Sequence, residues 1–316
     1  MKKTIFGFAT LMSAVVLAAC GGGGTDTSGN NSGGNSNNKE ELTFPIATKN
    51  NDDAIEDGEL EAAVATDSQF KGLFQWEFYQ DSFDAAFMAP SHEALFASND
   101  DFRITDDGAA TLDLAQDTKK ATIKIKDNVK WSDGEDVTAD DVIFPYEIIG
   151  HKDYTGIRYD DTFRNIVGME EYHDGSADTI SGIKKVDDKT VEIEYKDVNP
   201  SMLQAGGGIW SYAAPKHTLE GIAIKDMESS DQVRKNPVTF GPYYMSNIVA
   251  GESVEYLPNE HYWNGTPKLK KITMKSVPTA SATEALNSKL YDMIFQMPTD
   301  TYDTYKEISG YNKFRS

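Results

Sequence analysis

Cysteine is almost absent from this chain of 316 residues, in which Cys20 is the only one. A single thiol excludes an internal disulfide and any metal site built from several cysteines. The chain also lacks the Gly-x-Ser-x-Gly turn of many serine hydrolases, the His-Glu-x-x-His helix of zinc proteases and the ATP-binding P-loop. No metal-ligand spacing is found among its histidines, which are His92, His151, His173, His217 and His261. We therefore predict no catalytic residue, no metal site and no cofactor, and a protein that is not an enzyme. A glycosidase carboxylate pair has no signature by which sequence alone could find it.

Positive charge is also scarce. The 30 Lys and Arg residues face 51 Asp and Glu residues, which gives a formal net charge of −21. This balance argues against nucleic-acid binding, which usually needs a basic face, and is typical of a soluble extracellular surface. The acidic stretch Asp52–Gly58 does not fit a calcium-binding EF-hand, because Ile55 and Val64 would occupy two of the ligand positions.

Long hydrophobic runs are limited to the N-terminus. Lys2 and Lys3 precede the apolar run Ile5–Ala19, which is shorter than the roughly 20 residues of a membrane-spanning helix. Leu17–Cys20 fits a bacterial lipobox, so we predict a lipoprotein signal peptide over residues 1–19 and a lipid on Cys20. An ordinary signal peptide followed by a chance cysteine is the alternative. Residues 20–41, rich in Gly, Ser and Asn, are expected to be a flexible tether.

A structured motif follows at Lys130–Val142. Asp133-Gly134 predicts a tight turn, and Thr138 with Asp141 forms a variant capping box that opens a helix. Alternating residues over 121–126 predict a half-buried strand before the turn. Nothing in this motif is chemically reactive, so its value is as a signature.

Other local patterns predict further elements. Pro145 is expected to kink or shorten the helix that begins at Thr138. Residues 180–195 predict a hairpin around Asp187-Asp188, with Val191, Ile193 and Tyr195 on one face. A second hairpin is predicted from strands at 243–248 and 252–257, after the turn Gly241-Pro242. The remaining predictions are strands at 41–46 and 269–277, a helix at 283–290 and a buried strand at 291–295.

The order of these motifs resembles one protein family. Trp-Ser-Asp-Gly-x-x-Val-Thr-Ala-x-Asp-Val at 131–142, Gly-Pro-Tyr at 241–243 and Asn-x-x-Tyr-Trp at 259–263 are similar to segments of the solute-binding lipoproteins of oligopeptide ABC importers. The resemblance covers about Phe70 to Phe295, and it also suggests a strand at 70–76, a ligand-facing loop at 81–87 and a helix at 92–96. The Gly-rich tether resembles those of Gram-positive lipoproteins. Tyr262 and Trp263 are expected to pack in the core.

The resemblance implies an α/β, two-lobed fold of the periplasmic-binding-protein type II, or Venus flytrap, class. We expect lobe I at 42–89 and 200–273, an N-terminal subdomain inserted at 90–199, and the start of lobe II at 274–316. The second lobe is only begun, so the sequence is interpreted as truncated or as a fragment.

The implied function is that of a monomeric receptor, anchored by lipid to the outer face of the cell membrane. It would bind oligopeptides and deliver them to an ABC permease and its ATPase subunits. The candidate ligand contacts are Phe78, Tyr79, Asp81, Trp210 and Tyr212, although Trp210 and Tyr212 also fit a core strand. The alternatives are a receptor of the same fold for a signalling peptide, a sugar or a metal complex, and a truncated surface lipoprotein that does not transport.

Overall fold

The computed structural model describes residues 57–313. The predicted signal peptide, lipidated Cys20, tether and strand at 41–46 lie outside the described residues. Residues 57–305 lie in one compact unit, and residues 306–313 belong to a second unit. In that second unit, the Lys313 ammonium donates hydrogen bonds to the carbonyls of Ile308 and Tyr311.

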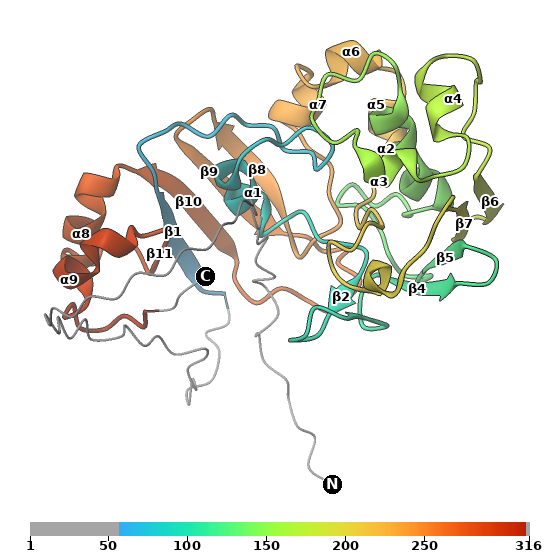
Figure 1. The fold of residues 1–316 in the computed structure, drawn as a ribbon. Helices are drawn as coiled ribbons and strands as arrows, with labels where there is room; N and C mark the ends of the chain where they lie inside the picture. The colour runs from blue at the N-terminus through green and yellow to red at the C-terminus, as the bar shows by residue number, and fades with distance from the viewer. Residues whose placement is uncertain (1–56, 314–316) are drawn as a thin grey trace, which may run out of the picture. The chain divides into compact units, whose positions relative to one another are not determined.

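One sheet has five strands in the order β11-β1-β10-β9-β8. Its strands are β1 (Glu59–Ala65), β8 (Tyr243–Val249), β9 (Ser253–Pro258), β10 (Lys271–Val277) and β11 (Met293–Phe295). The first strand runs parallel to both β10 and β11, whereas β9 is antiparallel to β10 and β8 (Figure 1). The predicted hairpin at 243–257 and the predicted strand at 269–277 are thereby confirmed.

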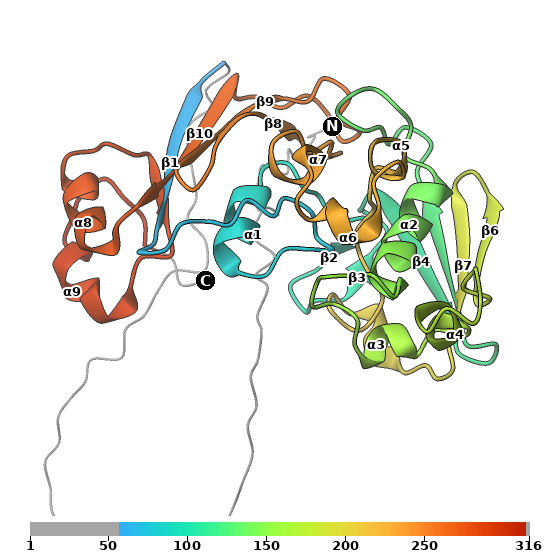
Figure 2. The same ribbon diagram turned by 90° about the horizontal axis from the view of Figure 1, so that it is seen from above.

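The second sheet has four antiparallel strands in the order β4-β5-β7-β6. They are β4 (Ala110–Ala115), β5 (Lys120–Ile125), β6 (Ile183–Asp187) and β7 (Thr190–Glu194). Helix α2 (Ala139–Gly150) contacts β6 and β7 and lies across this sheet (Figure 2). The predicted strand at 121–126 and the hairpin at 180–195 are confirmed.

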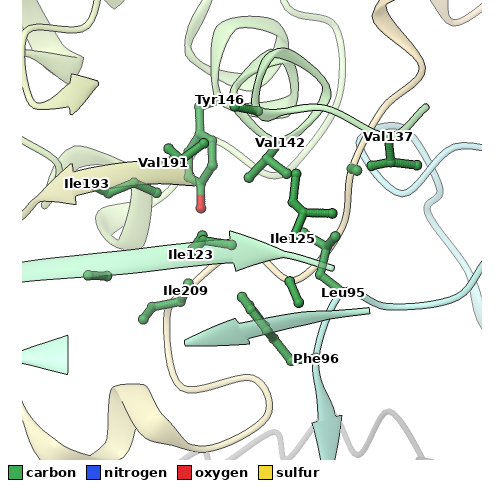
Figure 3. Close-up of a cluster of buried hydrophobic side chains, with 14 of the residues drawn as sticks. Leu95, Phe96, Ile123, Ile125, Val137, Val142, Tyr146, Val191, Ile193 and Ile209 are labelled. Carbon is green, nitrogen blue, oxygen red and sulfur yellow. The ribbon is translucent and has the colours of Figure 1, made fainter. Parts of the chain in front are cut away.

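Apolar and polar residues alternate along β5 and β7, and this alternation explains which side chains form the core under α2. Ile123 and Ile125 of β5 and Val191 and Ile193 of β7 are all at most 1% exposed. Figure 3 shows them in one cluster with Val142 and Tyr146 of α2, among other buried side chains. Because every second side chain of a strand faces the same way, each strand buries one apolar row under the helix.

Short elements complete the unit. The two-residue strands β2 (Ala97–Ser98) and β3 (Ile104–Thr105) pair with each other. The short helices are α1 (Ser82–Met88), α3 (Asp161–Arg164), α4 (Met169–His173), α5 (Lys216–Leu219), α6 (Ile224–Met227), α7 (Asp231–Arg234), α8 (Thr279–Asn287) and α9 (Tyr302–Tyr305), with 3-10 turns at Pro200–Leu203 and Thr299–Thr301. Helix α8 confirms the helix predicted at 283–290, although it begins earlier, at Thr279, and ends at Asn287.

Asp141 holds the signature motif together. Its carboxylate accepts the backbone N–H of Thr138 at 2.8 Å and that of Lys216 at 2.9 Å. The indole N–H of Trp131 donates to the same carboxylate at 3.3 Å. The side chain of Asp141 therefore caps α2, anchors Trp131 and fixes the segment that leads into α5. In a capping box the side chain of the third helical residue accepts the N–H of the N-cap residue. The bond from the Thr138 N–H to Asp141 confirms this part of the predicted capping box.

Pro145 lies inside α2 but does not shorten it, because the helix continues to Gly150. Proline has no N–H, so the carbonyl of Asp141 loses its donor within the helix. The backbone N–H of Ala214 donates to this carbonyl at 3.0 Å instead. A partner from outside the helix thus offsets part of the cost of the proline.

Three elements suggested by the resemblance are wrong. Residues 70–76 form no strand, because Gly72 has a φ of +71° and the backbone N–H groups of Gly72 and Leu73 donate to the Asp84 carboxylate. Residues 82–88 form helix α1 rather than a loop, since Asp81 caps its N-terminus. Residues 92–96 form no helix, because Leu95 exchanges backbone hydrogen bonds with distant Ser211 and Ala110.

Two further expectations need correction. The segment that contains Trp210 and Tyr212 is irregular, so the core-strand interpretation is wrong. Strand β11 is an edge strand with Met293 exposed rather than a buried one. The predicted lobe boundary at residue 274 stays a prediction, although β10 crosses it and β11 pairs with β1.

Candidate ligand-binding site

Three of the five predicted ligand contacts come together around Trp76. The Trp76 ring stacks on Tyr212, with centroids 4.2 Å apart and an interplanar angle of 18°. The edge of Tyr79 meets Trp76 at 5.1 Å, and Trp210 meets Tyr212 at 5.4 Å. We call these four residues the aromatic cluster. Trp210 packs against both the core under α2 and the core of the five-stranded sheet, so the cluster lies where the two cores meet.

Phe78 and Asp81 do not join the aromatic cluster. Phe78 is 1% exposed and packs in a separate core with Phe144 and Leu219, among others. Asp81 accepts the backbone N–H groups of Phe83 and Asp84 as the N-cap of α1, and its carboxylate lies 3.8 Å from the Lys71 ammonium. Both side chains therefore have structural roles, and their contact with a ligand stays a prediction.

Arg158 lies over the aromatic cluster and was missed by sequence reasoning. Its guanidinium carbon is 4.1 Å from the centroid of the Tyr79 ring, and its Nη2 donates to the Tyr79 carbonyl at 3.1 Å. The backbone N–H of Arg158 donates to the Tyr154 hydroxyl, which itself donates to the Glu77 carbonyl. The loop after α2 is thus tied to residues 77–79. No local pattern at 154–158 indicates this, since the partners lie 77 and 79 positions away.

Glu77 was also missed. It is 1% exposed, and neither carboxylate oxygen has a hydrogen-bond partner in the described part of the chain. Burial raises the pKa of Glu77 to about 7, whereas its own backbone N–H, the Trp210 side chain and the charge of Arg158 act to lower it. The indole N–H of Trp210 and the Nε of Arg158 also lack partners among residues 57–313. Unpaired polar atoms are therefore concentrated at this point of the interior.

Trp76 also lines a small pocket. Unpaired polar atoms on residues that line it are Trp76 Nε1, Glu93 Oε2 and Thr239 Oγ1, again judged within the described residues. Burial raises the pKa of Glu93 to about 7 and lowers the pKa of His92 to about 4. The other lining residues are Gln75, Trp131, Ala213, Val238 and Phe240. Trp76 thus connects a polar pocket with the aromatic cluster.

This arrangement suits non-covalent binding. Aromatic faces provide stacking and apolar contact, and Arg158 and Glu77 provide charge beside them. Within residues 57–313, no group of three or more His, Cys, Asp or Glu side chains is placed to hold a metal ion. The helices of the same region include none that is long and apolar enough to cross a bilayer. Trp263, expected in the core, packs against the core under α2.

Comparison with known protein families places the chain. Residues 103–316 match the model for the middle region of bacterial extracellular solute-binding proteins, family 5. The chain belongs to this family. Among curated relatives of this family 5 chain, the oligopeptide-binding protein OppA of Lactococcus lactis subsp. lactis is 36% identical over 274 residues, which cover 85% of this chain and 46% of the relative. The oligopeptide-binding protein AppA of Bacillus subtilis is 31% identical over 60% of this chain and 32% of its own length.

Solved structures of family members share the fold. Lactococcal OppA, complexed with an endogenous peptide in the closed conformation, superposes with a TM-score of 0.78 at 37% identity. That superposition covers 80% of this chain and 48% of the lactococcal protein. AppA of Bacillus subtilis in complex with a nonapeptide has a TM-score of 0.65 at 22% identity and supports the fold alone. The predicted α/β fold of two-lobed binding proteins is confirmed, and the chain spans about half the length of the relatives it matches.

Proposed function

We propose that this family 5 chain is an extracellular receptor that binds oligopeptides and delivers them to an ABC importer. The observation that carries the proposal is its likeness to lactococcal OppA, a protein whose solved structure holds an endogenous peptide. The aromatic cluster supports it, because stacked rings at the junction of two cores offer apolar surface to side chains of many kinds. Binding without chemical change is consistent with relatives that are solute-binding proteins.

Anchoring and delivery belong to the same proposal. A diacylated Cys20 would hold the receptor at the outer face of the membrane, since two acyl chains suffice for stable attachment. The loaded receptor would then meet a permease with its ATPase subunits as a monomer. The sequence contains no P-loop, so ATP hydrolysis is assigned to the partner.

Calorimetry on the full chain, purified in detergent, tests the binding step. Peptides of varied sequence are expected to bind, and Tyr212→Ala is expected to weaken binding about tenfold, because it removes the ring that stacks on Trp76. Tyr244→Ala is the matched control, since Tyr244 is a half-buried tyrosine of β8 outside the aromatic cluster. If no peptide binds but a sugar or a metal complex does, the proposal is contradicted.

A further inference from the structure

Arg158 is held beside the aromatic cluster without a carboxylate partner. One face of its guanidinium lies on the Tyr79 ring, and Nη2 donates to the Tyr79 carbonyl at 3.1 Å. Within the described residues, no Asp or Glu oxygen lies within 4.0 Å of it, and its buried Nε has no acceptor. Guanidinium groups stay charged and present N–H donors in a fork that matches a carboxylate. Arg158 is therefore oriented, charged and incompletely satisfied.

Glu77 is the acidic residue linked to Arg158, because the Tyr154 hydroxyl accepts the Arg158 backbone N–H and donates to the Glu77 carbonyl. Its charge interacts with Arg158, and it also raises the pKa of the Tyr154 and Tyr212 hydroxyls. Burial raises the pKa of both tyrosines, so they stay neutral near pH 7. Trp210 contributes only a neutral indole N–H. The charge state of this part of the interior is therefore set by Glu77 and Arg158 together.

A buried carboxylate is costly in its charged form, and the positive charge of Arg158 is one of the groups that stabilise this form of Glu77. A second anion that docks on Arg158 would compete for the same positive charge. Glu77 would then be left close to a negative group in a site with little water, which favours its neutral form. Anion binding and proton uptake are thus linked through Arg158.

We propose that Arg158 binds a carboxylate of the peptide ligand, and that Glu77 takes up one proton from solvent as this carboxylate docks. The inference rests on the proposed function and deepens it, because it assigns the peptide's anionic group to named residues. Arg158 contacts the carboxylate of the peptide. Glu77 does not touch the peptide and acts by changing its own charge beside Arg158.

Peptides with N-acetyl groups test the proposal, because acetylation removes the α-amino group that titrates near pH 8. Each peptide is prepared as a C-terminal free acid and as an amide, without Asp or Glu. The full chain is expected to bind the acid more tightly than the amide at pH 6. This preference should shrink by up to about tenfold per pH unit above 7, since at most one proton is taken up. Calorimetry in buffers of different ionisation enthalpy should detect that proton for the acid only.

Substitutions separate the role of Arg158 from that of Glu77. Arg158→Gln is expected to abolish the preference for the acid over the amide, while Arg158→Lys keeps part of the preference through its charge. Glu77→Gln is expected to keep the preference and to lose its pH dependence. The indole ¹⁵N–H signal of Trp210, beside Glu77, reports titration without any peptide. It should show a transition near pH 7 that is absent in Glu77→Gln and moved to higher pH in Arg158→Gln.

The outcomes distinguish the two proposals. If no peptide binds the full chain, the proposed function fails, and the inference fails with it. If peptides bind but acids and amides bind equally, or if binding of the acid takes up no proton, the inference alone is overturned. A folded Arg158→Gln protein, checked by the Trp210 signal, that still prefers the acid would also overturn it.

Discussion

Glu93 and His92 are neighbours in the chain whose burial has opposite consequences for charge. Burial raises the pKa of Glu93 from 4.5 to about 7 and lowers the pKa of His92 from 6.5 to about 4. Near pH 6 both side chains are mostly neutral in the folded protein, although both would be largely charged in the unfolded chain. The two residues therefore give stability a pH dependence of opposite sign.

We predict that Glu93→Gln changes this pH dependence. Between pH 4.5 and 7 the folded protein keeps a proton on Glu93 that the unfolded chain has released, so the free energy of unfolding falls as the pH rises through this window. The difference between wild type and Glu93→Gln should therefore fall by about 2–3 kcal/mol between pH 4.5 and 8. Urea unfolding at both pH values measures it. The contribution of His92 is the same in both proteins and therefore cancels in this difference. Glu220→Gln, at an exposed position, is the control for the change in net charge. A constant difference would contradict the prediction.

At the scale of elements, the turn before β8 depends on a close backbone approach. The N–H of Gly241 donates to the carbonyl of Ser91 at 3.0 Å, and the carbonyl of Gly241 accepts from the Asn259 side chain at 2.9 Å. A Cβ atom on Gly241 would lie 2.3 Å from the Ser91 carbonyl oxygen. Only glycine allows the turn to pack against the end of the segment that follows α1.

Gly241→Ala is therefore expected to lower the free energy of unfolding by about 2–4 kcal/mol, because backbone rather than a flexible side chain must move. Gly221→Ala is the matched control, since no heavy atom lies within 4 Å of the added Cβ. The control should stay within about 0.5 kcal/mol of wild type. Urea unfolding of both variants is the measurement. Equal effects of the two substitutions would show that the close approach is unimportant.

At the scale of the whole molecule, the five-stranded and the four-stranded sheet each border a core, and the aromatic cluster lies where these two cores meet. The chain covers 46% of the lactococcal relative, so the structure displays one part of what that protein contains. Ligand closure in two-lobed receptors is a hinge motion of both lobes.

Attachment to the membrane is the prediction at this scale. Cys20→Ser, expressed in a Gram-positive host, is expected to move the protein from the membrane fraction to the medium, because the thiol that carries the lipid is gone. Ser28→Ala, a substitution in the tether, should leave the protein in the membrane fraction. Mass spectrometry of the N-terminus identifies the lipid directly. Membrane retention of Cys20→Ser would refute lipidation as the anchor.

The sequence predicted the elements that depend on neighbouring residues. The Asp133-Gly134 turn, the cap at Thr138 and the alternating strands of both hairpins need only partners within a few positions. The resemblance to the family correctly placed the chain in an α/β fold. Predictions failed where long-range partners replaced local ones, as at residues 70–76 and 92–96, whose backbone groups bond to distant segments.

Only the tertiary structure brought the site together. Trp210 and Tyr212 could be proposed from their residue types, and Tyr79 from the resemblance to the family. Trp76, Glu77 and Arg158 join them through contacts between segments far apart in the chain. Sequence alone determined that the chain carries a strong acidic excess and a single thiol. Which carboxylates lose water, and so keep a proton near pH 7, depends on burial. Burial is a property of the packed molecule rather than of any local stretch of residues.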